Sequence, residues 1–247
     1  MKVSVITVSY NSALTLGDTL RSVAGQRHPD IEHILVDGAS NDHTHEVVRE
    51  HGAHLTRFIS EPDRGIYDAM NKGIAAATGD LIGFLNADDV LAHRDTVTRL
   101  AAVVAADDSD AVYGDLVYVR ADQTDKVVRL WRSGEYRRSR LRFGWMPPHP
   151  TFYVRNHVMR EAGGFDTRLR IAADYDFILR CLAAADRRVT YIPDVLVRMR
   201  LGGASNRDVG AMWRKSREDL DALRRSGVGG VGTLLCKNLR KLPQFLT

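Results

Sequence analysis

The side chains best suited to chemistry lie between residues 81 and 89, where an apolar run ends in oxygen-bearing residues. The run 81–85 is short and apolar, which predicts a strand buried on both faces, and Asn86, Asp88 and Asp89 follow it. Open α/β sheets bind ligands at the carboxyl ends of such strands. Carboxylate and amide oxygens suit Mg²⁺ or Mn²⁺, which share their coordination with substrate phosphates. The motif therefore predicts a site for a phosphate-bearing donor; alternatively, these residues only turn the chain and cap the next helix.

Other apolar runs also end in polar residues. The runs 3–8 and 31–36 lead into 9–11 and Asp37, respectively, and apolar residues at helical spacing over 16–24 separate them. Strand and helix patterns alternate in this way through the first part of the chain, which predicts a parallel sheet with right-handed crossovers. We therefore expect the polar strand ends to face one shared crevice.

The composition fits one α/β domain. The chain has 247 residues, of which 44% are hydrophobic and 27% charged, and this length can bury a large core. Cys181 and Cys236 lie far apart without metal-ligand spacing, which predicts a reduced, cytoplasmic chain. No apolar stretch approaches the roughly 18 residues that suggest a membrane span, and we expect no secretory leader.

Six short segments share their order and spacing with one enzyme family. They are 7–11, 36–44, 61–74, 84–89, 172–177 and 202–205. Together they resemble the family-two glycosyltransferases of the nucleotide-sugar-binding GT-A fold, and in particular the compact bacterial enzymes of exopolysaccharide synthesis, such as those for colanic acid. The most distinctive part is Asp-Arg-Gly-Ile-Tyr-Asp-Ala-Met-Asn-Lys-Gly at 63–73.

The resemblance implies a Rossmann-like α/β fold with a mostly parallel central sheet flanked by helices. The glycosyltransferase domain would cover 1–206, with a nucleotide-sugar half over 1–110 and a smaller acceptor half over 111–206. Residues 207–247 would form a basic amphipathic helical extension.

The function implied by the resemblance is inverting transfer of a sugar from a nucleoside-diphosphate donor to a hydroxyl of a saccharide acceptor. The acceptor would be lipid-linked, in cell-surface polysaccharide or glycolipid synthesis. UDP is the preferred donor nucleotide, with GDP or dTDP as alternatives, and the cofactor would be Mn²⁺ or Mg²⁺.

The resemblance also implies which residues hold the nucleotide. Asp37 would accept an N–H from the base edge, which favours uracil, thymine or guanine, although Asp37 could instead serve an Asx-turn. Arg64, Gly65 and Asn71 would surround the nucleotide and its phosphates. The expected contacts in the first loop are Thr7, Ser9, Tyr10 and Asn11.

Residues 86–88 occupy the position of the Asp-x-Asp motif of the family, with an amide in place of the first acid. Asn86 would contact the ribose, which leaves Asp88 as the metal ligand. Gly203 follows another strand pattern, and a glycine turn there can form an anion nest for the diphosphate. Because no histidine ligand accompanies it, the metal would rest mainly on Asp88 and the donor.

Asp174 is the candidate general base. It opens an amphipathic helical pattern after a short loop, and the resemblance implies that it takes the proton of the acceptor hydroxyl in a single inverting displacement. The family usually has Glu-Asp here, whereas this chain has Ala173-Asp174. Asp174 could also be a helix N-cap, and Asp176 is the alternative base.

The arginine- and aromatic-rich segment 132–150 is the candidate acceptor surface. Trp145 could stack on a sugar face and the arginines could bind a diphosphate; a solvated charge run is the alternative. His149 matches a family position near the acceptor, with a structural histidine as the other interpretation.

Charge is concentrated at the C-terminus. Residues 207–247 contain nine Lys/Arg against four Asp/Glu, which gives +5 and leaves −1 for the rest of a chain whose net charge is +4. Leucines alternate with lysine and arginine there, which predicts either a peripheral contact with the cytoplasmic face of the inner membrane or a helix packed on the domain. The basic residues form no nucleic-acid-binding module.

Two other functional classes compete with the glycosyltransferase hypothesis. A nucleotidyltransferase of related α/β architecture would have a basic glycine-rich loop after the first strand, which 7–16 lacks. A catalytically silent nucleotide-sugar-binding scaffold would lack Asp88 or Asp174, and both are present.

Overall fold

The computed structural model describes residues 1–202 and 209–239, with side chains left out for 209–213. The strands are β1 (Val3–Ser9), β2 (Ile31–Asp37), β3 (Arg57–Ser60), β4 (Leu81–Phe84), β5 (Val90–Leu91), β6 (Ala111–Val119), β7 (Val127–Trp131), β8 (Tyr153–Arg155) and β9 (Val189–Arg200). The helices are α1 (Leu16–Ala24), α2 (Thr44–His51), α3 (Ile66–Ala76), α4 (Thr96–Asp107), α5 (Arg138–Leu141), the 3₁₀ turn η1 (His149–Thr151), α6 (Asn156–Ala162), α7 (Ala173–Leu182), α8 (Val209–Arg225) and α9 (Val231–Leu239).

In the described part of the chain, nine strands form one sheet in the order β3-β2-β1-β4-β8-β6-β9-β5, with β7 paired to β6. The strands β3, β2, β1 and β4 are parallel, as expected for strands joined by helical crossovers. Beyond β4 the sheet becomes mixed, because β8 runs antiparallel to both neighbours and the short β6–β7 connection forms a hairpin. The predicted α/β class is confirmed, and the parallel region is its N-terminal part.

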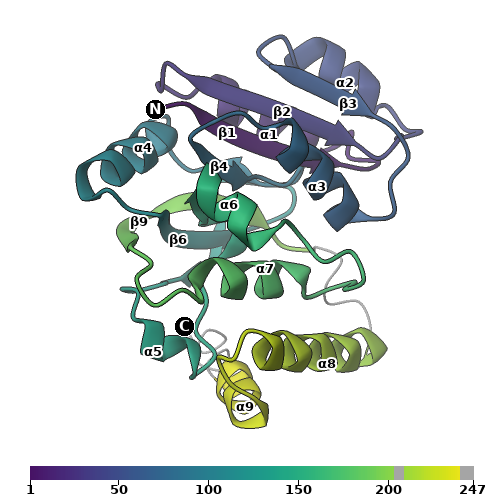
Figure 1. Ribbon diagram of the computed structural model, residues 1–247. Helices are drawn as coiled ribbons and strands as arrows, with labels where there is room; N and C mark the ends of the chain where they lie inside the picture. The colour runs from purple at the N-terminus through teal and green to yellow at the C-terminus, as the bar shows by residue number, and fades with distance from the viewer. Residues whose placement is uncertain (203–208, 240–247) are drawn as a thin grey trace.

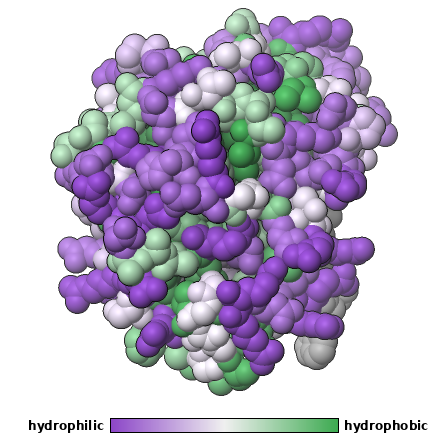
Figure 2. Space-filling view, viewed as in Figure 1, coloured by the Kyte–Doolittle hydropathy of each residue, from purple (hydrophilic) through white to green (hydrophobic). Residues whose placement is uncertain are grey.

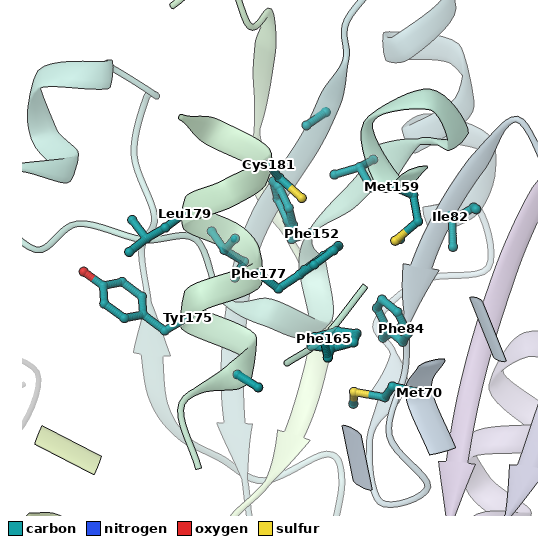
Figure 3. Packing of buried hydrophobic residues seen from close by; sticks show 14 of the residues in the cluster. Met70, Ile82, Phe84, Phe152, Met159, Phe165, Tyr175, Phe177, Leu179 and Cys181 are labelled. Atoms are coloured by element: carbon teal, nitrogen blue, oxygen red, sulfur yellow. The ribbon is translucent and has the colours of Figure 1, made fainter. Parts of the chain in front are cut away.

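Helices cover both faces of the sheet (Figure 1). Side chains of β1 point alternately to the two sides, so Ile6 and Val8 join a cluster with α3, α6 and α7, whereas Val3 and Val5 pack with α4. Figure 3 shows three aromatic residues of the first cluster: Phe84 of β4, Phe165 of the loop before α7, and Phe177 of α7. The Phe165 ring contacts both Phe84 and Phe177. This aromatic contact fixes α7 against the end of β4.

The C-terminal helices extend the α7 side of the molecule. In Figure 1, α8 runs alongside α7, and α9 lies against the end of α8. Lys237 of α9 and Asp219 of α8 are both almost fully buried, and their charged groups are 2.8 Å apart. The Lys237 ammonium also lies 3.2 Å from the centroid of the Tyr175 ring. These contacts attach α8 and α9 to α7.

Candidate active site

The carboxyl ends of β1, β2 and β4 lie at one edge of the sheet. The parallel register places Ser9 beside Asp37 and Ile6 beside Phe84, and the Leu85 amide donates to the Ile6 carbonyl at 2.9 Å. The loops that follow these three strands are therefore neighbours. The structure brings together the strand ends that the sequence predicts to share a crevice.

The turn after β4 holds two adjacent carboxylates in different surroundings. Asp88 is half-buried, whereas Asp89 is fully buried. Asn86 donates its side-chain N–H to Asp89 Oδ2 at 3.2 Å. Burial raises the pKa of Asp88, and burial together with the Asp88 charge raises the pKa of Asp89 well above its usual value. The turn therefore holds one partly exposed and one enclosed acid.

A buried arginine at the end of β9 supports this turn. The Arg200 guanidinium donates to the Asp88 carbonyl at 2.6 Å and to the Ala121 carbonyl at 3.1 Å, and forms an ion pair with Asp18 of α1. Arg200 is 6% exposed, and its charge opposes the rise in pKa of both Asp88 and Asp89. Arg200 was not predicted as a site residue; its only signal in the sequence is an arginine at the end of a strand pattern, before Gly202.

Asp37 sits at the centre of a hydrogen-bonded cluster. Its carboxylate accepts from the hydroxyls of Ser9, Ser40 and Ser60, from the Ser40 amide and from the His45 ring. Burial would raise the pKa of Asp37, but the hydrogen bonds from Ser40, His45 and Ser60 outweigh it and lower that pKa. These bonds fill the acceptor positions of the carboxylate, and they include the Asx-turn contact to Ser40.

The loops after β1 and β2 are joined to each other. The Asn11 amide donates to the Ser40 hydroxyl at 2.8 Å, and the Asn41 amide donates to Asn11 Oδ1 at 3.0 Å. Asn11 and Ala39 both have positive φ, at 49° and 59°, and an alanine rarely adopts this conformation. Tyr10 is 63% exposed beside them. A strained, cross-linked loop pair of this kind is typical of ligand-binding sites.

The N-terminus of α3 is open to solvent. Gly65 has φ 113°, and a Cβ placed there would meet no atom within 4 Å. Arg64 is exposed and pairs with Asp68 at 3.0 Å. The amides of Arg64 and Gly65 donate to the carboxylates of Asp68 and Asp63, at 3.1 and 2.8 Å. A helix N-terminus favours an anion, so a phosphate at this end of α3 would replace these carboxylates.

Asp174 is half-buried in the first turn of α7 and interacts electrostatically with Tyr67 and His149. Its charge acts on both: burial raises the pKa of Tyr67 and the Asp174 charge adds to this, whereas burial lowers the pKa of His149 and the Asp174 charge opposes this. His149 is 9% exposed and stacks on Phe84 with ring centroids 5.3 Å apart. His149 thus packs on the end of β4 and feels the Asp174 charge.

Two donor-side residues have their polar side-chain atoms engaged within the fold. Thr7 is fully buried and its hydroxyl lies 3.0 Å from His33 Nε2, so its side chain takes part in the β1–β2 pairing. The Asn71 side-chain amide forms two hydrogen bonds with the backbone of Phe165, at 2.9 and 2.8 Å. Asn71 therefore fastens α3 to the loop before α7, and its polar atoms are occupied.

Two of the acceptor-side candidates are buried in the described structure. Trp145 is 4% exposed, packs on Tyr113 and donates to the Ser133 carbonyl at 2.8 Å, so it is a core residue without a free face for a sugar. Asp176 is 3% exposed and pairs with Arg180 and Arg225. It faces a hollow of about 300 Å³ behind α7.

His149 has the surroundings of the structural alternative, since its ring is enclosed by Phe84 and Phe165. Its Nε2 atom is buried without a hydrogen-bond partner, and the Asp174 charge still reaches the ring. The predicted anion nest at Gly203 lies outside the described residues.

The turn at 86–89 has donors that fit a divalent cation. Asp88 is half-buried, and the Oδ1 atoms of Asn86 and Asp89 are buried without hydrogen-bond partners. Oxygen donors of this kind suit Mg²⁺ or Mn²⁺. Within residues 1–202 and 209–239, no group of three or more His, Cys, Asp and Glu side chains has the arrangement of a metal site.

Comparison with known proteins places the chain among sugar-transferring enzymes. The family model "Glycosyl transferase family 2" matches residues 4–162. A "PGL/p-HBAD biosynthesis glycosyltransferase" of Mycobacterium bovis is 34% identical over 208 residues, which cover 82% of this chain and 78% of the relative. An uncharacterized glycosyltransferase of Mycobacterium tuberculosis is 34% identical over 234 residues, covering 92% and 86%.

Solved structures agree in fold. S. aureus TarS in complex with UDP-GlcNAc has a TM-score of 0.72 at 20% identity, covering 92% of this chain and 66% of TarS 1–349. The mannosyltransferase PcManGT of Pyrobaculum calidifontis, in complex with GDP-Man and Mn²⁺, has a TM-score of 0.66 at 20% identity, covering 98% and 70%. This chain spans 65% of the length of uncomplexed TarS 1–349. These likenesses confirm the GT-A fold.

The comparisons confirm the predicted family but not its subtype, because the curated relatives described above act in mycobacterial PGL/p-HBAD synthesis or are uncharacterized. The exopolysaccharide subtype stays a prediction. None of the helices in the described ranges combines the length and apolarity of a membrane span.

Proposed function

The chain belongs to glycosyl transferase family 2, and we propose that this glycosyltransferase moves a sugar from a nucleoside-diphosphate donor to an acceptor hydroxyl with inversion. The observation that carries the proposal is the adjacency of three polar strand ends. Ser9, Asp37 and the 86–89 turn lie along one sheet edge. His149 stacks on Phe84 at that edge and interacts electrostatically with Asp174.

The nucleotide would lie over the loops after β1 and β2. Tyr10 and Asn11 are exposed there, and an exposed tyrosine ring can stack on a base. Asp37 would hold the shape of this loop. It would contact the base edge if an N–H of the base replaced the His45 ring as a donor to its carboxylate, since that ring is exposed. The nucleotides named with the solved structures, UDP-GlcNAc and GDP-Man, support a donor of this class.

The diphosphate would lie between the N-terminus of α3 and the 86–89 turn. Arg64 is exposed and Gly65 leaves the backbone open to close approach. Asn86 would contact the ribose, and Asp88 would hold a divalent cation together with the donor phosphates. When bound, such a cation neutralises charge on the departing nucleoside diphosphate; the Mn²⁺ named with PcManGT supports this assignment.

Asp174 would act as general base. The acceptor oxygen forms a bond to the anomeric carbon, its proton passes to the Asp174 carboxylate, and the bond from that carbon to the nucleoside diphosphate breaks. Because attack and departure occur on opposite faces of the sugar, one displacement inverts the anomeric configuration. The half-buried position of Asp174 leaves its carboxylate accessible to an acceptor hydroxyl.

Family membership favours sugar transfer over the nucleotidyltransferase alternative. The scaffold alternative is disfavoured by the presence of both Asp88 and Asp174 at the expected places in the fold.

A lipid-linked acceptor would place the enzyme at a cytoplasmic membrane surface. On α9 the residues Val231, Leu235 and Leu239 recur every four positions and are 55%, 59% and 61% exposed. Phe143 is 58% exposed on the loop after α5, and this loop touches α9 because the space beside Gly144 is filled by Lys237. We call these four side chains the α9 face, and hydrophobic surface is visible over α9 at the lower edge of Figure 2.

Positive charge accompanies the α9 face. Arg137, Arg138 and Arg142 are exposed on and around α5, which is adjacent through the loop that touches α9. An apolar stripe with neighbouring arginines fits an anionic lipid surface. Residues 240–247 lie outside the described residues; they include Arg240 and Lys241, on which the sequence-based prediction partly depends.

A binding screen tests the proposed function. Calorimetry with UDP-, GDP- and dTDP-sugars, each with and without Mn²⁺, should give one preferred nucleotide whose affinity rises with Mn²⁺. The preferred donor is then offered with saccharide acceptors, and the product should have the inverted anomeric configuration by NMR. Absence of binding to any of the donors, or a product of retained configuration, contradicts the proposal.

A further inference from the structure

A glutamate on α8 holds the loop that precedes α7. The Glu218 carboxylate accepts the backbone N–H groups of Arg170 at 3.1 Å, Ile171 at 2.9 Å and Ala172 at 2.9 Å. Three consecutive amides thus converge on one carboxylate, and hydrogen bonds to an ionised acceptor are roughly twice as strong as neutral ones. Asp174 follows two residues after the last of them.

The same loop is held from the opposite side by α3. The Tyr67 hydroxyl donates to the Ile171 carbonyl at 2.7 Å. The backbone of Ile171 therefore donates its N–H to Glu218 and accepts the Tyr67 hydroxyl at its C=O. Tyr67 is two residues from Gly65, at the end of α3 that we assign to the donor phosphates.

The helix that carries Glu218 is itself firmly attached. Asp219, the next residue, is 2% exposed and pairs with Lys237 at 2.8 Å, and the Lys237 ammonium packs on the ring of Tyr175. Tyr175 adjoins Asp174 in α7. The α8 backbone is thus fixed next to the loop contact, at the residue that follows Glu218, so Glu218 can set the loop conformation with little freedom.

We propose that Glu218 is a positioning residue for catalysis: together with Tyr67 it clamps residues 170–172 and so sets where the Asp174 carboxylate meets the acceptor hydroxyl. This inference rests on the proposed role of Asp174 as general base. It assigns a function to the C-terminal extension, because α8 lies beyond the residues matched by the family model. The clamp also connects the donor side of the site, through Tyr67, to the base.

The test compares Glu218→Gln and Tyr67→Phe with a matched control. Glutamine keeps the size of Glu218 but loses one accepting oxygen, and phenylalanine loses only the hydroxyl. Asp221→Asn is the control, since Asp221 is an exposed acid on the same helix. Three properties are measured in the full-length chain: amide exchange of residues 170–172, the donor Kd by calorimetry, and kcat for sugar transfer.

Both clamp variants should exchange these amides faster and lower kcat by about 10- to 100-fold, because small misplacements of a reacting group have effects of this size. The donor Kd should be unchanged. The double variant should lose less than the product of the single losses, since both act on one loop. Asp221→Asn should change none of the three properties.

Faster exchange with wild-type kcat would overturn the inference, and so would a donor affinity that falls in parallel with kcat, which indicates a general structural role. If Glu218→Gln does not fold, Tyr67→Phe alone decides, because its single lost bond is on the α3 side. Failure of the proposed function is distinguishable: an active Asp174→Asn enzyme removes the base assignment, whereas an inactive one beside a fully active Glu218→Gln enzyme removes only the clamp.

Discussion

Asp88 and Asp89 are neighbours in sequence and differ in what each can do. Asp89 is fully enclosed, and both burial and the Asp88 charge raise its pKa. Asp88 is more exposed, and the Arg200 charge opposes the rise in pKa of both acids. When two adjacent acids compete for one proton, the more enclosed one retains it. We therefore propose Asp88 as the charged oxygen ligand, with Asp89 shaping the turn.

This division predicts the behaviour of Asp88→Ala. Removing the charged ligand should weaken nucleotide binding by about 10-fold or more in the presence of Mn²⁺, which corresponds to about 1.4 kcal/mol, and leave binding without Mn²⁺ nearly unchanged. Calorimetry under both conditions measures this. Asp122→Asn is a suitable control, because Asp122 forms an exposed pair with Arg120. An Asp88→Ala protein with the normal Mn²⁺ response contradicts the ligand assignment.

The strands that carry the site are joined below it by a buried chain of polar groups. The Thr7 hydroxyl meets His33 Nε2 at 3.0 Å, and His33 Nδ1 meets His54 Nε2 at 2.9 Å. Burial, with a further contribution from the His54 charge, lowers the pKa of His33 from 6.5 to about 3. The pairing of β1 with β2 therefore requires a neutral histidine at its centre.

This requirement predicts how stability depends on pH. Between pH 6.5 and 3 the unfolded chain binds a proton at His33 and the folded chain does not, so the free energy of unfolding falls as the pH drops below 6.5. From pH 6.5 to 5 the loss from this site is about 2 kcal/mol. Urea unfolding at pH 7.5 and 5 measures how far the free energy of unfolding falls between these pH values. We expect the fall to be smaller in His33→Gln than in the wild-type protein by about this amount. An equal loss in both proteins refutes the assignment.

The sequence predicted those elements whose signal is local. The apolar runs 3–8, 31–36 and 81–85 match β1, β2 and β4 to within one residue at each end. The match is close because a strand buried on both faces needs a continuous apolar run. The contacts of Asn71 and Trp145 inside the fold were not predicted, since a motif does not tell which side of a helix or loop faces the core. Their partners, the Phe165 backbone and Ser133, become neighbours only after folding.

Arg200 and Glu218 could not be predicted for a related reason. Arg200 reaches the Asp88 carbonyl across 112 positions of sequence, and Glu218 reaches Ala172 across 46. Neither has a local pattern that indicates its partner. Long-range contacts of this kind depend on how β9 and α8 pack, and this packing cannot be read from local patterns in a single sequence.

At the scale of the whole molecule, the α9 face lies on the last described helix, beyond α7 and α8. The sheet positions the donor loops, α7 carries Asp174, and α8 and α9 stack beyond it (Figure 1). Phe143, Val231, Leu235 and Leu239 are the exposed apolar side chains of that end. Attachment to lipid through this face would leave the opposite, donor end in solution.

The lipid-surface proposal predicts that Leu235→Glu weakens binding to anionic vesicles. Loss of one apolar anchor and addition of a negative charge should lower the affinity by about 10-fold or more. Cosedimentation with phosphatidylglycerol vesicles measures this, and Val128→Glu is the control, because Val128 is 52% exposed on β7. Equal effects of the two substitutions, or equal binding to neutral vesicles, count against the α9 face.

Sugar transfer in the proposed mechanism depends on Asp174 as the group that receives the acceptor proton. Asp174→Asn keeps the size of the side chain and removes the base, so sugar transfer should fall by at least about 100-fold, within the usual range for general base catalysis. The most direct measurement is kcat of this variant beside its donor Kd by calorimetry. We expect near-total loss of kcat with an unchanged Kd, and wild-type kcat would contradict the mechanism.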